Sequence, residues 1–108
     1  MIESLLNKLK QISVRHKEVE KLLSLPDVTQ DQENYIKLTK EYSDLTPIVI
    51  SYENFLKIKD SLLELDQLKE DQDIEIREMA LSESSDLEQE IDLLISEIRQ
   101  HLLPKDPN

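Results

Sequence analysis

The sequence predicts an all-α fold, an elongated antiparallel three-helix bundle with coiled-coil character. Apolar residues recur at alternating spacings of three and four along most of the 108-residue chain, glycine is absent, and aromatic residues make up only 4%. Apolar residues three and four positions apart lie on one face of a helix. A composition dominated by Leu, Ile, Glu, Lys, Asp and Ser also favours long helices over sheets. The expected helices cover about 2–24, 30–69 and 73–103.

The first helix is predicted from a regular heptad stripe that ends at a proline. The stripe consists of Ile2, Leu5, Leu9, Ile12, His16, Val19 and Leu23. Such spacing places all seven side chains on one helix face, as in a coiled coil. Pro26 disfavours a helical conformation for the residue before it, so the helix is expected to end near residue 24.

The second helix is expected to begin near residues 29–31. Thr29 with Gln32, and Asp27 with Gln30, each have the spacing of a capping box, in which a side chain accepts from a free backbone N–H. The apolar stripe that follows consists of Tyr35, Leu38, Tyr42, Leu45, Val49, Tyr52 and Leu56, and continues less regularly through Phe55, Leu62, Leu63 and Leu65.

Pro47 falls inside this stripe and admits two interpretations. Proline in a helix interior removes one backbone hydrogen bond and costs about 3 kcal/mol, so the chain could form two helices with Thr46 as the N-cap of the second. The heptad phase, however, crosses Pro47 without a shift. This continuity favours a single helix over 30–69, kinked at Pro47.

The third helix is predicted to begin at Asp73, which suits an N-cap, and to end before Pro104. Its stripe consists of Ile76, Ala80, Leu87, Ile91, Leu94, Ile98 and Leu102. The stretch 81–86 interrupts the stripe, and Ser85 with Glu88 could begin a fresh helix there. One helix over 73–103 is favoured. Pro104 and Pro107 are then expected to leave residues 104–108 as a polar tail after the last helix.

The net charge of −11 is unevenly distributed, at +2 over residues 1–25, −5 over 26–70 and −8 over 71–103. An acidic chain repels nucleic acid phosphates, so no DNA binding is expected, and only the first segment could face RNA. Its five basic residues lie outside the apolar stripe and are candidate partner-facing residues, although ordinary solvation is the favoured explanation: Lys8, Lys10, Arg15, Lys17 and Lys21.

No catalytic, cofactor-binding or metal-binding residues are predicted, and no cofactor is expected. The chain has no cysteine for thiolate ligands and no glycine for a phosphate-binding loop. His16 and Glu20 share a helix face, but two ligands are too few for a metal site, and a hydrogen-bonded structural histidine is favoured. The acidic side chains of the third helix are interpreted as a solvated face. Tyr35, Tyr42 and Tyr52 are interpreted as core-edge residues rather than a base-stacking platform.

The chain contains no apolar stretch long enough for a membrane span, and its start lacks the apolar core of a secretory signal. A cytoplasmic location is therefore expected.

Four stretches together resemble the start of bacterial peptide chain release factors: VRHKEVEKLL (14–23), QENYIKLTKEYSDL (32–45), IREMA (76–80) and LLPKDPN (102–108). The last is more similar to the type that reads UAA and UAG than to the type that reads UGA. Proteins of that family hydrolyse peptidyl-tRNA with a Gly-Gly-Gln loop and read stop codons with a Pro-x-Thr tripeptide. This sequence contains neither. The resemblance therefore implies a non-catalytic N-terminal helical domain over 1–103, with 104–108 beginning a linker to absent codon-reading and catalytic domains.

The resemblance further implies an interaction role on the ribosome. In the family this domain projects toward the stalk base of the large subunit, near ribosomal protein L11 and its rRNA, and is implicated in the response to the GTPase release factor. Pro47 departs from the expected family pattern. Two other hypotheses remain: a free-standing homodimeric coiled-coil scaffold unrelated to translation, and an all-helical hydrolase using carboxylates and a metal. Exposed heptad edges also predict that the isolated domain can pair with a second copy.

Overall fold

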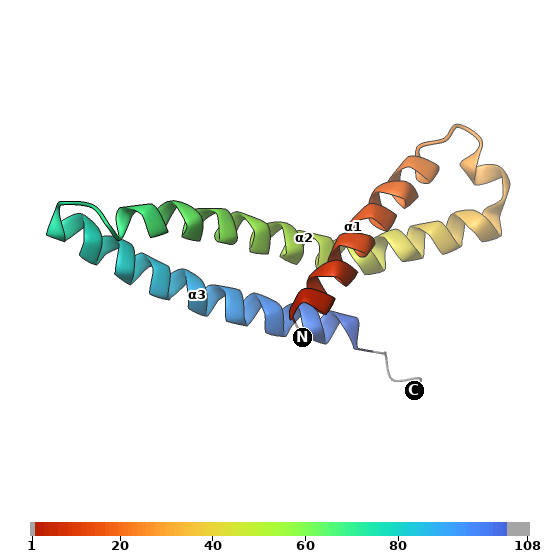
Figure 1. The fold of residues 1–108 in the computed structure, drawn as a ribbon. Coiled ribbons are helices and arrows are strands. Elements are labelled where there is room, and N and C mark those ends of the chain that lie inside the picture. The colour runs from red at the N-terminus through yellow and green to blue at the C-terminus, as the bar shows by residue number, and fades with distance from the viewer. Residues whose placement is uncertain (1, 104–108) are drawn as a thin grey trace. The chain divides into compact units, whose positions relative to one another are not determined.

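The computed structural model describes residues 2–103, and these form three α-helices and one short 3₁₀ turn (Figure 1). The elements are α1 (Ile2–Leu23), η1 (Val28–Gln30), α2 (Gln32–Leu68) and α3 (Ile74–Leu102). The predicted all-α class is confirmed, and the bounds of α1 and α3 agree with the prediction to within a residue. The predicted stop at Pro104 and the predicted linker 104–108 lie outside the described residues. The chain divides into two compact units, Met1–Ile50 and Ser51–Asn108.

The start of α2 differs from the prediction. The helix begins at Gln32, and its cap is Asp31, whose Oδ1 accepts a hydrogen bond of 3.2 Å from the backbone N–H of Asn34. Of the predicted capping-box residues, Asp27, Thr29 and Gln30 lie in or beside η1, and Asp27 makes no side-chain cap bond. The tight turn already pairs the Gln30 N–H with the Asp27 carbonyl at 3.0 Å. The first backbone N–H groups without a partner therefore belong to the first turn of α2, where the Asp31 carboxylate can accept from them.

Pro47 lies within the continuous helix α2, so the favoured single helix is confirmed and the two-helix alternative is wrong. Thr46 does not cap a new helix. Its hydroxyl donates instead to the carbonyl of Tyr42, one turn earlier, at 2.6 Å. Because proline has no N–H, the carbonyl of Ser43 loses its usual helical donor at this point. The kink itself stays a prediction.

In the unit Met1–Ile50, α1 packs on the first part of α2, and the two helices cross in opposite directions (Figure 1). The buried apolar side chains of this unit come from both helices: Leu9, Val19, Leu38, Ile48 and Val49. Val19 is completely buried, and Tyr42 and Leu45 are half-buried. Four of these five residues belong to the predicted stripes and Ile48 does not, whereas the stripe residues Ile2 and Tyr35 are exposed.

In the unit Ser51–Asn108, the second part of α2 and α3 run antiparallel and are joined by a short turn (Figure 1). Asp71 and Asp73 shape this turn, because each carboxylate accepts a bond of 2.9 Å from the backbone N–H two residues later. The second of these bonds confirms Asp73 as the N-cap of α3. Arg77 closes the turn from within α3 by donating to the Asp71 carbonyl at 2.7 Å.

The buried side chains of this second unit include two serines beside apolar residues: Ser51, Phe55, Leu65, Ala80, Ser84 and Ile98. α3 runs unbroken through 81–86, as favoured, and Ser84 fills the gap in its apolar stripe at only 3% exposure. Its hydroxyl has no hydrogen-bond partner among the described residues.

Beyond Val49, the predicted stripe of the second helix is wrong at two positions, because Leu56 is 43% exposed and Leu63 is 64% exposed. Phe55 and Leu65, which the less regular part of the prediction included, are buried. The heptad extrapolation carried the spacing of the first part of the helix onward without a shift. The second part of α2 instead belongs to the unit that contains α3.

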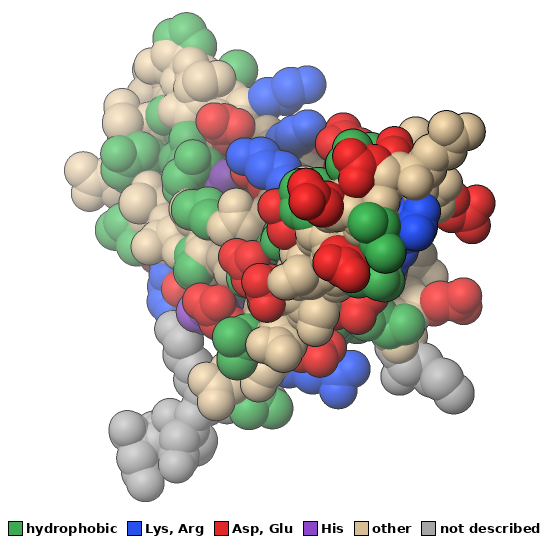
Figure 2. All heavy atoms as spheres, turned by 90° about the vertical axis from the view of Figure 1, so that its left-hand side faces the viewer, with side chains coloured by type: hydrophobic (Ala, Val, Ile, Leu, Met, Phe, Trp, Pro, Cys, Tyr) green, Lys and Arg blue, Asp and Glu red, His purple; other side chains and the backbone are tan. Residues whose placement is uncertain are grey.

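The acidic side chains predicted to be solvated are all exposed on α3: Glu83, Asp86, Glu88, Glu90, Asp92 and Glu97. Further carboxylates gather at the end of this unit where α2 and α3 are joined, which faces the viewer in Figure 2. Within residues 2–103, no helix combines the length and the apolar character needed to cross a membrane.

Candidate functional site

All five candidate partner-facing residues lie on α1, but they do not share one surface. At about 100° per residue, Lys10, Lys17 and Lys21 fall within roughly 40° of one another on the side of α1 opposite its buried stripe. All three are exposed. Lys8 is also exposed but lies about 150° away around the helix. Arg15 is half-buried and points toward α2, where it is engaged in an ion pair.

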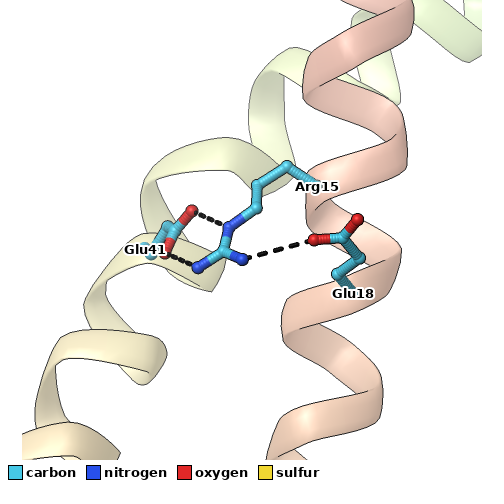
Figure 3. A network of polar contacts seen from close by, with 3 residues as sticks. All are labelled: Arg15, Glu18 and Glu41. Carbon is cyan, nitrogen blue, oxygen red and sulfur yellow. Dashed lines mark hydrogen bonds and ion pairs between the residues drawn. The ribbon is translucent and has the colours of Figure 1, made fainter.

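Arg15 joins α1 to α2 through a two-pronged contact with Glu41 (Figure 3). Its Nε donates to one carboxylate oxygen at 2.6 Å, and its Nη2 donates to the other at 2.8 Å. Nη1 forms a longer ion pair of 3.3 Å with Glu18, one turn along α1. Planar guanidinium and carboxylate groups match in this geometry, which makes such pairs stronger and more directional than single contacts.

The pKa values of the pair shift in the directions expected for an ion pair. The hydrogen bonds from Arg15 lower the pKa of Glu41 below its ordinary value, and the charge of Arg15 acts in the same sense. The hydrogen bonds to Glu41 raise the pKa of Arg15. Both groups therefore stay ionised at neutral pH. Arg15 serves the packing of the unit, and the guanidinium is already engaged by two carboxylates.

His16 is a hydrogen-bonded structural residue, as the sequence predicted. Its ring stacks on Tyr42, with centroids 4.5 Å apart and planes inclined by 22°. Its Nε2 lies 3.0 Å from the hydroxyl oxygen of Thr46. That hydroxyl already donates to the Tyr42 carbonyl, so Nε2 must act as the donor toward it. No group of three or more His, Cys, Asp and Glu side chains in residues 2–103 is arranged to hold a metal ion.

The three aligned lysines flank an exposed apolar residue that sequence analysis missed. Val14 is 54% exposed and lies in the same row, one turn from Lys10 and one turn from Lys17. A shallow hollow of about 300 Å³ is formed here by Lys10, Gln11, Val14, Arg15 and Glu18. We call the row Lys10, Val14, Lys17 and Lys21 the outer stripe. In the sequence, this exposed residue could have been noticed as a valine that lies outside the heptad stripe and among charged residues.

The tyrosines do not form a common platform in the first unit. Tyr42 is half-buried against His16, whereas Tyr35 is 38% exposed on the outside of α2. There it lines an open hollow of about 500 Å³ together with residues of the same helix, Ile36, Thr39, Lys40, Ser43 and Asp44. Because the Tyr42 ring already stacks on His16, it is not free to stack on a base, which agrees with the predicted core-edge role.

Comparison with known proteins identifies the relatives of the chain. The PCRF domain family matches residues 12–108. Peptide chain release factor 1 of Lawsonia intracellularis is 44% identical over 100 residues, which cover 93% of this chain and 28% of that protein. Peptide chain release factor 1 of Clostridioides difficile is 38% identical over 105 residues, which cover 96% of this chain and 30% of that protein. No solved structure matches the chain.

The chain thus spans less than a third of the length of these curated relatives. The residues that pack α1 on α2, Arg15 and His16 on one helix and Glu41 and Tyr42 on the other, lie in two of the stretches that carry the resemblance. A match over almost the whole chain, with relatives of one name, confirms that resemblance: the chain belongs to the PCRF domain family.

Proposed function

We propose that this chain acts in translation termination, as a non-catalytic helical domain of a peptide chain release factor. The observation that carries the proposal is the PCRF match over residues 12–108, together with relatives that are named peptide chain release factor 1. A free-standing coiled-coil scaffold would give no reason for this match. Action on ribosomes would place the protein in the cytoplasm.

The proposed partners are the stalk base of the large ribosomal subunit, with ribosomal protein L11 and its rRNA, and the GTPase release factor. The charge distribution supports a contact through α1. Residues 71–103 carry a net charge of −8, whereas residues 1–25 carry +2. Among the five candidate residues, the outer-stripe lysines are the most suitable, because Arg15 is already paired with Glu41.

A hybrid release factor tests the proposal. In it, this chain replaces the matching segment of the Lawsonia intracellularis protein. We expect the hybrid to support peptide release from ribosomes stalled at a UAA codon. Combining Lys10→Glu with Lys17→Glu should weaken its ribosome binding. The matched control Lys8→Glu, which changes the same charge on another side of α1, should have a smaller effect.

Two results would count against this function. A hybrid that neither binds ribosomes nor supports release, although its helical circular dichroism shows a folded domain, would remove the basis of the proposal. Equal weakening by Lys8→Glu and by the outer-stripe changes would show a general charge effect instead of a contact surface.

The chain alone should not release peptide, because the chemistry is expected elsewhere in a complete factor. The measurement is the release of labelled peptide from stalled ribosomes with the 108-residue chain added in excess. Release above the level without the protein would show that the non-catalytic assignment is wrong.

A further inference from the structure

The outer stripe combines unpaired positive charge with an apolar centre. The side-chain ammonium groups of Lys10, Lys17 and Lys21 form no ion pair or hydrogen bond with any residue in the described part of the chain. Spacings of four, three and four residues align the row along about 16 Å of helix. Val14 lies inside this row and presents more than half of its surface to solvent.

The hollow beside Val14 suits an apolar side chain better than a phosphate group. It is lined by Lys10, Gln11, Val14, Arg15 and Glu18, and the Glu18 side chain is 58% exposed. A phosphate placed here would meet that negative charge. Arginine binds phosphate most effectively through two N–H groups of its planar guanidinium, but the guanidinium of Arg15 is already bound in this way by Glu41.

The net charge of the chain also favours a protein partner over a nucleic acid. A nucleic acid strand carries a phosphate charge at every nucleotide, so its charge extends past the outer stripe and meets repulsion from the acidic remainder of a chain of net charge −11. A protein segment can concentrate a few carboxylates where the lysines lie. It can also gain binding free energy by burying an apolar side chain, a contribution that does not depend on charge.

We propose that the outer stripe of α1 binds an acidic helical protein segment, whose carboxylates pair with Lys10 and Lys17 while one apolar side chain seats against Val14. This deepens the proposed function and rests on it, because it names the class of partner for the same surface. A helix laid along α1 would repeat its side chains at the same three- and four-residue spacing as the stripe.

A titration of the isotope-labelled 108-residue chain tests the partner class directly. The probes are a short amphipathic peptide built from Glu, Leu and Ala, the same peptide with Gln in place of Glu, and a single-stranded RNA oligonucleotide. NMR amide shifts identify the surface, and their saturation gives each Kd. We expect the Glu peptide to shift the amides of residues 10–21 and to bind more tightly than the other two probes.

Two substitutions separate charge from apolar contact. Lys17→Glu should weaken binding of the Glu peptide by roughly tenfold, and Val14→Ser by roughly fivefold. Lys8→Glu is the matched control and should change the Kd by less than twofold or so, because Lys8 lies on another side of α1. All of these positions except Val14 carry charged, exposed side chains, so the fold should survive each change, which helical circular dichroism verifies.

Three outcomes would overturn the proposal: no saturable binding of the Glu peptide, a Kd unaffected by Val14→Ser, or tighter binding of the RNA that depends on Lys17 alone. The last would make the surface a nucleic-acid contact. These results are independent of peptide release by the hybrid factor. Peptide binding at the stripe with an inactive hybrid would contradict the proposed function, whereas an active hybrid without peptide binding would contradict only the partner class.

Discussion

At the scale of single residues, the Arg15–Glu41 pair gives the protein a specific pH dependence. The pKa of Glu41 is lowered in the folded state, so the folded protein holds its proton less tightly than the unfolded chain does. The stabilisation is therefore fully present above the ordinary glutamate pKa of about 4.3 and is lost as the pH falls through the lowered value. Arg15 remains charged throughout, because its pKa is raised.

Glu41→Gln should accordingly lower the melting temperature by a few degrees at pH 7, and the difference from the unchanged protein should shrink as the pH falls below about 4. Thermal unfolding followed by circular dichroism at a series of pH values measures this. The control Glu18→Gln removes only a longer contact of 3.3 Å and should have a smaller effect. A difference that stayed constant from pH 7 to pH 3 or so would show that the ion pair is not its cause.

His16 provides a second prediction at this scale. The Thr46 hydroxyl donates to the Tyr42 carbonyl and accepts from the ring, so neutral His16 should carry its proton on Nε2. The nitrogen chemical shifts of the ring report this tautomer directly. Thr46→Val should cost about 1 kcal/mol in the free energy of unfolding, because the partly buried ring then lacks an acceptor.

Thr39→Val is the matched control for Thr46→Val. Thr39 makes the same kind of bond to a carbonyl one turn earlier, the Tyr35 carbonyl at 2.8 Å, but it is exposed and has no histidine beside it. An equal loss of stability in both variants would place the effect in the hydroxyl–carbonyl bond and would contradict a role for the His16 contact.

At the scale of the element, α2 tolerates a proline that should still reduce its stability. Pro47 is exposed, so its ring contributes little to packing, while its missing N–H and its ring crowding disturb the helix. Pro47→Ala should raise the free energy of unfolding by about 2–3 kcal/mol, measured by urea denaturation. Asn54→Ala, at another exposed position within α2, should add only about 0.5 kcal/mol. Equal gains would mean that Pro47 costs no more than ordinary helix propensity.

Helix α3 contains a buried hydroxyl that should also reduce stability. Ser84 is 3% exposed, and its oxygen has no hydrogen-bond partner within residues 2–103. Burial of an unpaired hydroxyl costs about 1–3 kcal/mol. Ser84→Ala should therefore stabilise the protein by at least about 1 kcal/mol more than Ser82→Ala, which makes the same change at an exposed position of α3. If urea denaturation shows the same gain in the free energy of unfolding for both variants, burial of the Ser84 hydroxyl does not reduce stability.

At the scale of the whole molecule, the helices could be predicted from sequence because their ends depend on local chemistry. Pro26 ends α1, and the Asp73 carboxylate begins α3, and both effects act over a few residues. The cap of α2 was predicted wrongly because η1 used the backbone donors first. No local rule predicts which face of a long helix is buried when its packing partner changes, as between Val49 and Phe55 of α2.

The candidate site was predictable only in part, because some of its features depend on local spacing and others on how the helices pack. The lysines on α1 follow from their spacing along the helix. The pairing of Arg15 with Glu41 does not, because 26 residues separate them and the contact depends on how α1 packs on α2. Val14 was missed because a single apolar residue outside a heptad stripe has no periodic signal of its own. Its position between lysines gains meaning only when its exposure is known.

The uneven net charge also makes the stability of the whole chain depend on salt. On α3, Asp86 lies three residues after Glu83 and four before Glu90, and like charges at these spacings repel one another along a helix. The total of −11 adds a longer-range repulsion, which salt reduces as the screening length falls from about 30 Å at 0.01 M to about 10 Å at 0.1 M. Salt weakens the attraction within the Arg15–Glu41 pair and so lowers stability there, but this is a single contact.

We therefore expect the free energy of unfolding, measured by urea denaturation, to rise between about 0.01 M and about 0.3 M NaCl. Asp86→Asn should make this rise smaller, because it removes the central charge of the three carboxylates without shortening the side chain. Lys8→Gln, which makes the net charge more negative, should make the rise larger. A decrease in stability with added salt would show that ion pairs outweigh the repulsion among the carboxylates. The Arg15–Glu41 contact would then be the first to examine, by repeating the salt series with Glu41→Gln.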